Sequence, residues 1–363
     1  MNKDLKNLSI NETRVDSGAI EFCERFMRSS SHRYVFGCNQ WAKSIAEHIN
    51  VDGFVDDFTS SEVFCGKPVI RVNAVPKKAM VVSAVVLGRP ITAQIKLNDR
   101  GVCSLDYYAF KKYSGLPLKE VTFLGEFEDE FKLNSARFES IYDQLADLES
   151  RRIFSRLINF RLTRDLSYME GFVDAQDRQY FESFLDLQRQ GEVFVDVGSY
   201  DGYTSQEFIK RCPDYRAVHI FEPEPSNMTG VKERLRDYGN IHYHPYGASD
   251  KAQVLRFKSG GSSSSISDDG ELTINVERID DLVQEPFTFL KMDIEGGEVP
   301  ALLGASSSIV AHHPRLAISV YHKADDLWRI PELVLTFRND YELYLRHYTE
   351  GVDETVMFFL PKR

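Results

Sequence analysis

The sequence has little of what marks secreted, membrane-spanning or nucleic-acid-binding chains. Its 363 residues include five cysteines without a C-x-x-C pair, which disfavours a disulfide framework or a zinc site and fits reduced thiols. The amino-terminal segment is polar, and the richest apolar run, Met80–Leu87, is too short to cross a bilayer. The chain has 44 basic and 55 acidic residues, and the resulting net charge of −11 disfavours nucleic acid and anionic membranes as partners. We therefore expect a cytoplasmic protein.

The chain does contain enough apolar material for two domains. Its 42% hydrophobic and 27% charged residues are ordinary for a globular protein of this length. Residues 1–124 are predicted to form a small α/β domain, with a strand at Tyr34–Phe36 and a helix at Trp41–Ile49. Residues 125–190 have helical periodicity without a strand pattern, which predicts a helical connector. In residues 191–363 the alternation of strands and helices returns, which indicates a second α/β domain.

The second α/β domain shows its elements as separate patterns. Strands are expected at 193–197, 217–221, 241–246, 289–292, 316–321, 341–347 and 355–360. Helices are expected near 205–210, 227–238, 298–310 and 326–337. Ser259–Ser267 is the one low-complexity stretch, and we predict a mobile loop there. The first of these strands leads into the most informative turn.

That turn has the pattern D-x-G-x-x-x-G, formed by Asp196, Gly198 and Gly202. Glycines at these positions are expected to let backbone amides approach a ligand over the carboxyl end of the strand. A dinucleotide-binding turn needs glycine at two positions that Tyr200 and Tyr203 occupy. The pattern therefore argues against a pyrophosphate cradle.

An acidic residue ends the following strand. Glu222 lies 26 residues after Asp196 and precedes a proline. A carboxylate at this place in a doubly wound fold can accept hydrogen bonds from both ribose hydroxyls. The alternative is a surface carboxylate in front of a proline turn.

A third charged segment follows the strand at 289–292. Lys291, Asp293 and Glu295 alternate with apolar residues, so their side chains are expected to point in one direction, toward the ligand crevice. Two glycines then allow a tight entry into a helix that begins near Glu298. Glu295 and Glu298 have an alternative role as helix-capping carboxylates.

Together these segments resemble the FkbM family of S-adenosylmethionine-dependent methyltransferases. The resemblance covers residues 126–360 and rests on several motifs in order. They are LADLESRRIFSRLINFRLTRD (145–165), QYF (179–181), the VDVGSYDGYTSQEF turn, FEPEPSN (221–227), GASD (247–250), the serine loop, FLKMDIEGGE (289–298) and ISVYHKADDLW (318–328).

The resemblance implies a Rossmann-like class I methyltransferase domain with a seven-stranded, mostly parallel sheet. Its last strand pair is antiparallel, and residues 341–347 and 355–360 can supply it. The resemblance also implies S-adenosyl-L-methionine as cofactor, with Glu222 at the ribose. The methionine part is then surrounded by Asp196, Gly198, Ser199, Tyr200, Asp201 and Gly202, and the adenine region by Gly247–Asp250, including Ala248 and Ser249.

Methyl transfer to a hydroxyl is helped by a base near the acceptor. Asp293 is our first candidate and His322 the second, because an imidazole accepts a proton near neutral pH. Lys291 and Glu295 complete the predicted catalytic set, with Lys291 orienting the acids. Such a cluster could instead hold a divalent cation, but we assign no metal. The pair in His242-x-His244 lacks a third ligand in view, so we interpret it as structural.

The amino-terminal block is similar to the small α/β domain that precedes sugar-nucleotide-linked acyltransferases. The similarity covers residues 33–87 through VFGCNQWAKSIAEHI, GFVDDF and FCGKPVI. Gly37 and Lys43 could meet a phosphate, whereas Cys38 is expected to be a buried thiol. A docking or oligomerisation role is the alternative, so a homo-oligomer stays open. This similarity favours a glycan or sugar acceptor over a polyketide-like small molecule.

Two other functions stay open from the sequence alone. An NAD-dependent oxidoreductase would share the fold and the ribose carboxylate, although Tyr200 and Tyr203 oppose it. A non-catalytic protein that binds S-adenosylmethionine or a sugar nucleotide would use the same residues without transfer.

Overall fold

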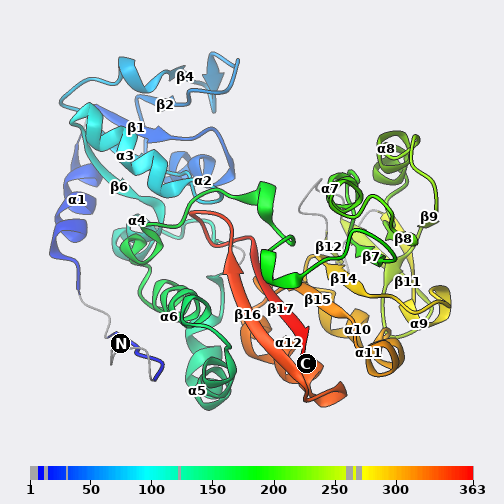
Figure 1. The fold of residues 1–363 in the computed structure, drawn as a ribbon. Coiled ribbons are helices and arrows are strands. Elements are labelled where there is room, and N and C mark those ends of the chain that lie inside the picture. Colours follow the sequence, from blue (N-terminus) through cyan, green and yellow to red (C-terminus); the bar gives the residue numbers. More distant parts are fainter. Residues whose placement is uncertain are drawn as a thin grey trace. The chain divides into compact units, whose positions relative to one another are not determined.

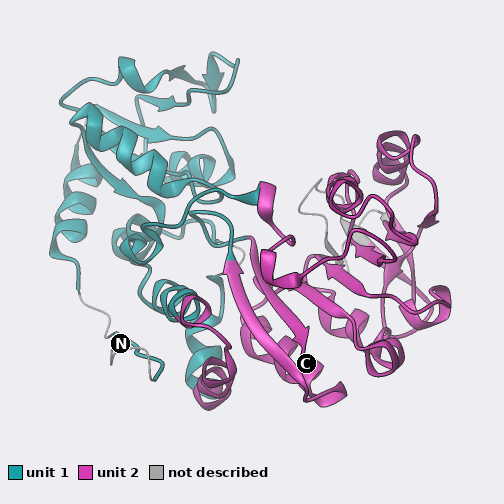
Figure 2. Ribbon diagram, in the orientation of Figure 1, with its two compact units in different colours: residues 1–133, 152–176, 347–353 teal, residues 134–151, 177–346, 354–363 magenta. Residues whose placement is uncertain are grey.

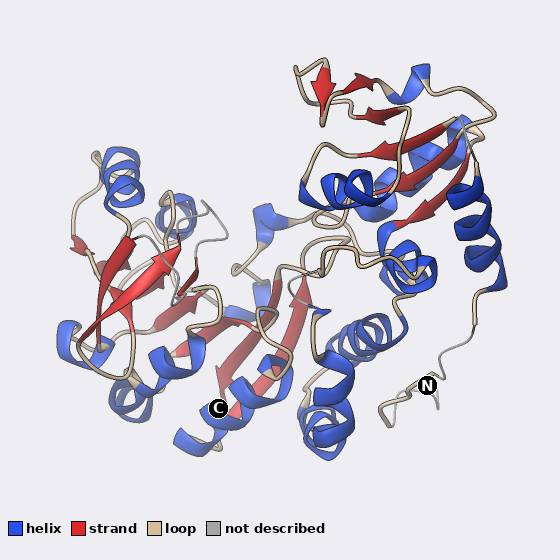
Figure 3. Ribbon diagram, turned by 180° about the vertical axis from the view of Figure 1, so that it is seen from behind, coloured by secondary structure: helices blue, strands red, loops and turns tan. Residues whose placement is uncertain are grey.

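The computed structural model describes residues 7–11, 15–29, 32–121, 124–258, 265–266 and 272–362. The chain divides into two compact units (Figure 2). Unit 1 comprises residues 1–133, 152–176 and 347–353, and unit 2 comprises residues 134–151, 177–346 and 354–363. In each unit helices flank the strands (Figure 3). This confirms the predicted α/β class.

Unit 1 contains a six-stranded sheet in the order β3-β4-β2-β1-β5-β6 (Figure 1). Its central strand β1 pairs in parallel with both β2 and β5, and β3 alone runs antiparallel to its neighbour β4. The strands are β1 (Arg33–Phe36), β2 (Gly53–Val55), β3 (Val63–Phe64), β4 (Lys67–Ile70), β5 (Met80–Ser83) and β6 (Cys103–Asp106). The helices are α1 (Ser17–Arg28), α2 (Gln40–His48), α3 (Pro90–Arg100) and α4 (Tyr107–Ser114).

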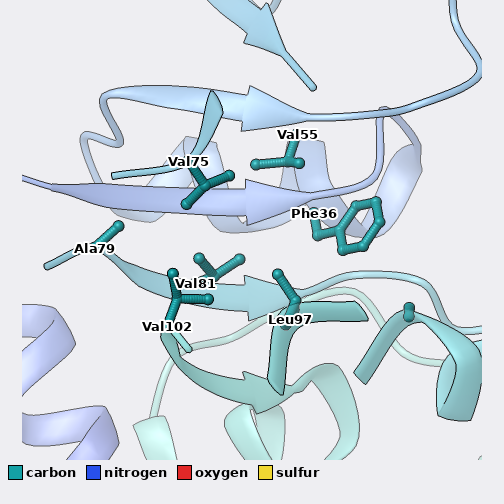
Figure 4. Packing of buried hydrophobic residues seen from close by; sticks show 8 residues of the cluster. Phe36, Val55, Val75, Ala79, Val81, Leu97 and Val102 are labelled. Atoms are coloured by element: carbon teal, nitrogen blue, oxygen red, sulfur yellow. The ribbon is translucent and has the colours of Figure 1, made fainter. Parts of the chain in front are cut away.

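The core of unit 1 forms where aliphatic side chains of the sheet meet those of α3. Phe36, Val55 and Val81 come from three neighbouring strands, and Leu97 comes from α3 (Figure 4). Each of these four side chains is at most 4% exposed. Burying a side chain of this size contributes about 1.5–3 kcal/mol, so the apolar runs of the sequence specify this layer.

The predicted connector forms two long helices, α5 (Phe127–Gln144) and α6 (Leu148–Thr163). Each helix is divided between the two units, at residues 133/134 and 151/152. Three short 3₁₀ turns then lead to unit 2, at Leu166–Met169, Gln176–Arg178 and Ser183–Leu185. The borders expected at residues 124 and 190 stay a prediction.

Unit 2 is built on a seven-stranded sheet in the order β16-β17-β15-β14-β7-β8-β9. β17 runs antiparallel to β15, whereas β15, β14, β7, β8 and β9 are mutually parallel. The strands are β7 (Val193–Val197), β8 (Ala217–Phe221), β9 (Ile241–His244), β14 (Phe289–Met292), β15 (Arg315–Ser319), β16 (Tyr341–His347) and β17 (Thr355–Pro361). The expected seven-stranded, mostly parallel sheet is confirmed.

A ring stack fixes the helix that follows β7. Phe194 of β7 stacks on Phe208 of α7 (Tyr203–Arg211), with ring centroids 4.5 Å apart, and on Phe289 of β14 at 5.0 Å. All three rings are fully buried. The stack packs the carboxyl-terminal half of α7 against the amino-terminal part of β7 and so holds the helix that follows the informative turn against the sheet.

The remaining helices of unit 2 are α8 (Pro225–Arg234), α9 (Ile279–Leu282), α10 (Glu298–Leu303), α11 (Ser306–His312) and α12 (Asp326–Phe337). The prediction of a single helix over 298–310 is therefore wrong, because two helices, α10 and α11, occupy this range. The chain breaks at Gly304, where a Cβ would overlap the carbonyl oxygen of Ser249, and the Gly304 carbonyl accepts the Asp280 amide at 2.9 Å. A contact with a distant segment thus ends the first helix.

A four-stranded sheet in unit 2 has no counterpart in the sequence predictions. Its order is β10-β13-β11-β12, with β10 (Gly247–Ala248), β11 (Gln253–Lys258), β12 (Ser265–Ile266) and β13 (Leu272–Glu277). Of the serine-rich stretch, residues 259–264 and 267 lie outside the described residues, so its predicted mobility stays a prediction. Among the described helices, none is both long and apolar enough to cross a membrane.

Candidate active site

The predicted site residues come from adjoining strands of one sheet. β14, β7 and β8 are neighbours in this order, with β15 on the other side of β14. Asp293, Gly198 and Glu222 follow the last residues of β14, β7 and β8. Since these strands are parallel, their carboxyl ends lie at one edge of the sheet, which is where such sheets bind ligands.

Asp196 does not face this edge as a free carboxylate. Its side chain is fully buried, accepts a hydrogen bond from the Ser205 hydroxyl at 2.7 Å, and lies 3.2 Å from the Lys291 ammonium. Lys291 is 3% exposed and also donates to the Gly198 carbonyl at 2.6 Å. Lys291 was predicted to point in the same direction as Asp293 and Glu295 and to orient them. That prediction is wrong, because the Lys291 ammonium contacts Asp196 and the Gly198 carbonyl instead. In the sheet register Lys291 lies beside Asp196, which it neutralises.

The turn after β7 uses its amides within the protein. The Gly198 amide donates to the Phe221 carbonyl at 3.0 Å, and the Tyr200 amide donates to Glu222 at 2.9 Å. Gly198 has φ +78°, and a Cβ there would overlap the Asp293 carbonyl oxygen. This glycine therefore allows close approach of the β7 and β14 ends, and the expected approach of the turn's amides to a ligand stays a prediction.

Glu222 ties the β7 and β8 turns together. One carboxylate oxygen accepts the Tyr200 amide and the other accepts the Glu224 amide, each at 2.9 Å. Burial raises the pKa of Glu222 above its ordinary value, and these hydrogen bonds oppose that shift. The side chain can still accept further donors, because a carboxylate oxygen has two lone pairs.

The remaining predicted cofactor residues surround these two turns. The Ser199 hydroxyl is buried and has no hydrogen-bond partner in the described part of the chain. Asp201 pairs with Arg234 at 2.7 Å instead of facing the sheet edge. Ala248 and Ser249 are buried beside β13, and a Cβ on the preceding Gly247 would lie 3.8 Å from Pro223. This segment therefore lies next to the end of β8, where the adenine region is expected.

Three carboxylates surround one buried histidine at the ends of β14 and β15. His322 Nε2 lies 3.3 Å from Asp293 Oδ1 and 3.6 Å from Glu295 Oε2. On its other side, His322 Nδ1 lies 3.0 Å from Glu298 Oε1. The His322 and Glu298 side chains are 2% and 1% exposed, whereas Asp293 and Glu295 are 21% and 20% exposed. Asp293 and Glu295 are thus the accessible members.

The protonation of His322 decides its role. Burial alone would lower the pKa of His322, but the carboxylates of Glu298, Asp293 and Glu295 outweigh burial and raise it to about 10. The ring is then an imidazolium at neutral pH and has no lone pair to take a proton. The structure therefore does not support His322 as the second candidate base. It supports a cation that holds Asp293 in place.

Two tyrosines near Asp293 were not predicted as site residues. Tyr180 donates from its hydroxyl to Asp293 Oδ2 at 2.6 Å, and the Tyr321 hydroxyl lies 3.5 Å from Asp293 Oδ1. Burial, with the nearby Asp293 and Glu354 carboxylates, raises the pKa of both phenols well above 10, so both stay neutral donors. The QYF motif, which contains Tyr180, is the one sequence signal that could have marked this residue. The Tyr180 backbone has φ +70°.

The residues present suit the cofactor expected from the sequence better than a metal. Along the ends of β7 and β8 lie the buried Ser199 hydroxyl, the Glu222 carboxylate and the small residues 247–249. This set of groups fits an adenosine joined to an amino acid. One ligand atom each from Asp293, Glu298 and His322 could meet at an ion, lying within 4.8 Å of one another. An ion there would have to displace the proton that the carboxylates hold on the His322 ring, because a ligating ring nitrogen carries no hydrogen.

Comparisons with known proteins agree with this geometry. The sequence model of the methyltransferase FkbM domain matches residues 196–349. The crystal structure of methyltransferase FkbM from Methylobacillus flagellatus KT is 25% identical, covers 98% of this chain and 95% of its own, and gives a TM-score of 0.74. No curated protein matches the chain.

Two further structures match about half of the chain. An rRNA methylase from Streptococcus thermophilus is 16% identical, with 49% and 92% of the two chains covered and a TM-score of 0.34. Fibrillarin from Aeropyrum pernix, with natively bound S-adenosyl-L-methionine, is 13% identical, with 48% and 69% covered and a TM-score of 0.31. We draw nothing further from these two partial likenesses.

The amino-terminal resemblance to an acyltransferase domain stays a prediction, since none of these matches names such a domain. For the carboxyl-terminal part, the sequence motifs, the seven-stranded sheet and the match to residues 196–349 agree. The M. flagellatus structure extends the likeness over nearly the whole chain. Residues 196–349 of this chain therefore match the methyltransferase FkbM domain, within a fold that is similar to a methyltransferase FkbM structure over nearly its whole length.

Proposed function

We propose that this methyltransferase transfers a methyl group from S-adenosyl-L-methionine to a hydroxyl of a sugar or a related small molecule. The observation that carries the proposal is the placement of Asp293. Its carboxylate is 21% exposed and is held by Tyr180, Tyr321 and His322, next to the turn that Glu222 organises. A fixed, accessible carboxylate at this place suits removal of a proton from an acceptor hydroxyl.

The protein's own groups have separate tasks in this proposal. Glu222 accepts the ribose hydroxyls, Ser199 donates its unused hydroxyl, and Ala248 and Ser249 pack near the adenine. When bound, S-adenosylmethionine would supply the methyl group, and the leaving group would be its neutral thioether, S-adenosylhomocysteine. Asp293 then positions the acceptor oxygen and takes its proton, while the His322 imidazolium fixes the carboxylate.

Glu295 and Lys291 have indirect tasks. Glu295, at φ +55°, begins the turn that leads to α10 and lies beside His322, so it helps to keep that ring protonated. Lys291 neutralises the buried Asp196 and thereby stabilises the β7 end. Both are positioning residues in this scheme.

The acceptor class and the location of the protein belong to the same proposal. A glycan or sugar acceptor is favoured by the resemblance of residues 33–87 to a domain of sugar-nucleotide enzymes. A cytoplasmic location is favoured by the cysteines, because all five are free thiols. Ser262–Ser265, proposed to close over the acceptor, lies outside the described residues apart from Ser265.

Calorimetry with the purified chain tests the cofactor part. We expect S-adenosylmethionine and S-adenosylhomocysteine to bind and NADH not to bind. Glu222→Gln should weaken binding at least about tenfold, since one acceptor oxygen becomes a donor. Glu233→Gln, a change on an exposed helix residue, is the matched control. Binding of NADH alone would favour the oxidoreductase and contradict the proposal.

The acceptor part needs a transfer assay. The chain and radiolabelled S-adenosylmethionine are incubated with sugar nucleotides, free glycans and polyketide-like alcohols. Label in a sugar hydroxyl supports the proposal. Label in the polyketide-like alcohols alone contradicts the sugar preference, and cofactor binding without transfer to any acceptor favours a binding protein.

A further inference from the structure

A second group of polar side chains in unit 2 lies on the neighbouring strands β8 and β9 and on a segment outside the sheet. It consists of His219 on β8, His242 and His244 on β9, and Glu285 in the segment between α9 and β14; we refer to it as the histidine cluster. His219 and His242 are register partners on adjacent parallel strands. The sequence pair His242-x-His244 lacked a third ligand, and the fold supplies two more groups.

The cluster is compact. His219 Nε2 lies 3.2 Å from Glu285 Oε1, and His219 Nδ1 lies 3.1 Å from His244 Nε2. The rings of His219 and His242 are stacked at 4.6 Å between centroids. One ligand atom from each of His219, His242 and Glu285 lies within 4.8 Å of the other two.

One of these distances matches a tetrahedral metal site. Zinc bonds to imidazole nitrogen and carboxylate oxygen at about 2.0–2.2 Å, which places neighbouring ligand atoms about 3.3 Å apart. The separation of His219 Nε2 and Glu285 Oε1 is already 3.2 Å. The side chain of His242 is exposed and can turn toward them.

We propose that His219, His242 and Glu285 bind one zinc ion, with water in the fourth position and His244 fixing the ring of His219. This site goes beyond methyl transfer and does not depend on it. It would connect β8, the sheet-edge strand β9 and the segment after α9, and so stabilise that edge of unit 2.

The hydrogen-bond chain explains how the site changes on binding. Without metal, His244 Nε2–H donates to His219 Nδ1, and His219 Nε2–H donates to Glu285. With metal, His219 carries its hydrogen on Nδ1 and donates to His244, which frees Nε2 as a ligand. Each ring keeps one hydrogen, so the change is a shift of tautomer without a change of charge.

Glu285 has a second partner outside the histidine cluster, which contacts only one of its two carboxylate oxygens. Arg216 Nε lies 3.2 Å from Glu285 Oε2 on a side chain that is 63% exposed. Oε1, which lies beside His219 Nε2, is then the carboxylate oxygen available to the metal.

Zinc titration of the full chain by calorimetry, after chelator treatment, tests the proposal. We expect one zinc per chain, and at least about tenfold weaker binding in His242→Ala and in Glu285→Gln. His48→Ala, an exposed histidine of unit 1, and Asp293→Asn are controls that should bind as the wild type does. Circular dichroism verifies that each variant is folded.

Two results would overturn the site. One is a wild-type chain that binds no zinc, or whose zinc binding is lost in Asp293→Asn and kept in His242→Ala. The other is a cobalt(II) spectrum with a thiolate charge-transfer band, since the proposed ligands contain no sulfur. Neither result bears on methyl transfer, which the assays above measure separately.

Discussion

The two units begin their parallel sheets alike but finish them differently. In unit 1 the turn after β1 is closed by Asn39, whose oxygen accepts the Trp41 and Ala42 amides and whose nitrogen donates to the Ala84 carbonyl. In unit 2 the corresponding turn lies over a buried ion pair, Asp196 and Lys291. The turn between strand and helix is therefore held by side-chain capping of backbone groups in unit 1 and lies over a buried ion pair in unit 2.

That difference teaches where chemistry can be located. Capping satisfies backbone groups and leaves no reactive side chain, whereas buried charges need partners and bring several side chains into one place. The Asp293 and His322 cluster lies at the strand ends of unit 2. The strand, turn and helix that open each parallel sheet do not distinguish the units, whereas the residues at the strand ends do.

Substitution of the first glycine in each turn should show the largest effect. Gly198→Ala puts a Cβ onto the Asp293 carbonyl oxygen at φ +78°, so we expect a loss of at least about 4 kcal/mol in the free energy of unfolding of unit 2. Gly37→Ala makes its closest contact with the Asn39 side-chain amide at 3.0 Å and overlaps no backbone atom, so it should cost about 1–3 kcal/mol. Urea unfolding measures both, and equal losses would refute the contrast.

Neutralising the accessible carboxylate should reduce catalysis strongly. Asp293→Asn removes the proposed base, so we expect kcat to fall about 10²- to 10⁴-fold while the affinity for S-adenosylmethionine is kept. The control is Asp57→Asn in unit 1, which removes a carboxylate that pairs with Lys96 and has no part in the candidate active site. It should leave kcat unchanged. A fall in cofactor affinity equal to the fall in kcat would show that Asp293 only supports the pocket.

The two lysine-aspartate pairs should differ in their contribution to stability. Lys291→Met leaves Asp196 buried without its cation and should cost about 3–5 kcal/mol, because both side chains are at most 3% exposed. Lys96→Met breaks the exposed pair with Asp57 in unit 1 and should cost about 0–1 kcal/mol.

Chemical denaturation compares these two single variants. The double variant with Asp196→Asn should recover part of the loss, because no uncompensated charge then stays buried. A loss in Lys291→Met as small as that in Lys96→Met would mean that water reaches the buried pair.

For each single unit of pH, the pH dependence of stability should be smaller than the effects of these substitutions at buried positions. The pKa of His322 rises from 6.5 to about 10 on folding, so its stabilisation is complete below pH 6.5 and is lost as the pH rises toward 10. The loss is at most about 1.4 kcal/mol for each pH unit. Hydrogen exchange measured at pH 7 and at pH 9.5 should therefore show that α10 and α12 open more readily at the higher pH, relative to the helices of unit 1. A parallel change in both units would contradict the assignment.

Much of unit 2 follows from local sequence alone. The apolar runs predict β7, β8 and β14 to the residue, because each strand is buried on both faces and therefore carries few polar residues. Parallel strands also place their carboxyl ends together, so Gly198, Glu222 and Asp293 were expected at one edge. The four-stranded sheet was not expected, since Gln253–Lys258 alternates polar and apolar residues weakly.

The partners of these residues were decided by the tertiary structure. Tyr180 reaches Asp293 across 113 positions and Lys291 turns to Asp196 across 95, distances over which no local periodicity carries information. His219 and Glu285 likewise join the histidine pair on β9 only through the sheet. Even the charge of His322 depends on burial among three carboxylates. The order of strands and the residues at their ends are written in the chain, whereas pairing and protonation arise only when folding removes water from groups far apart in it.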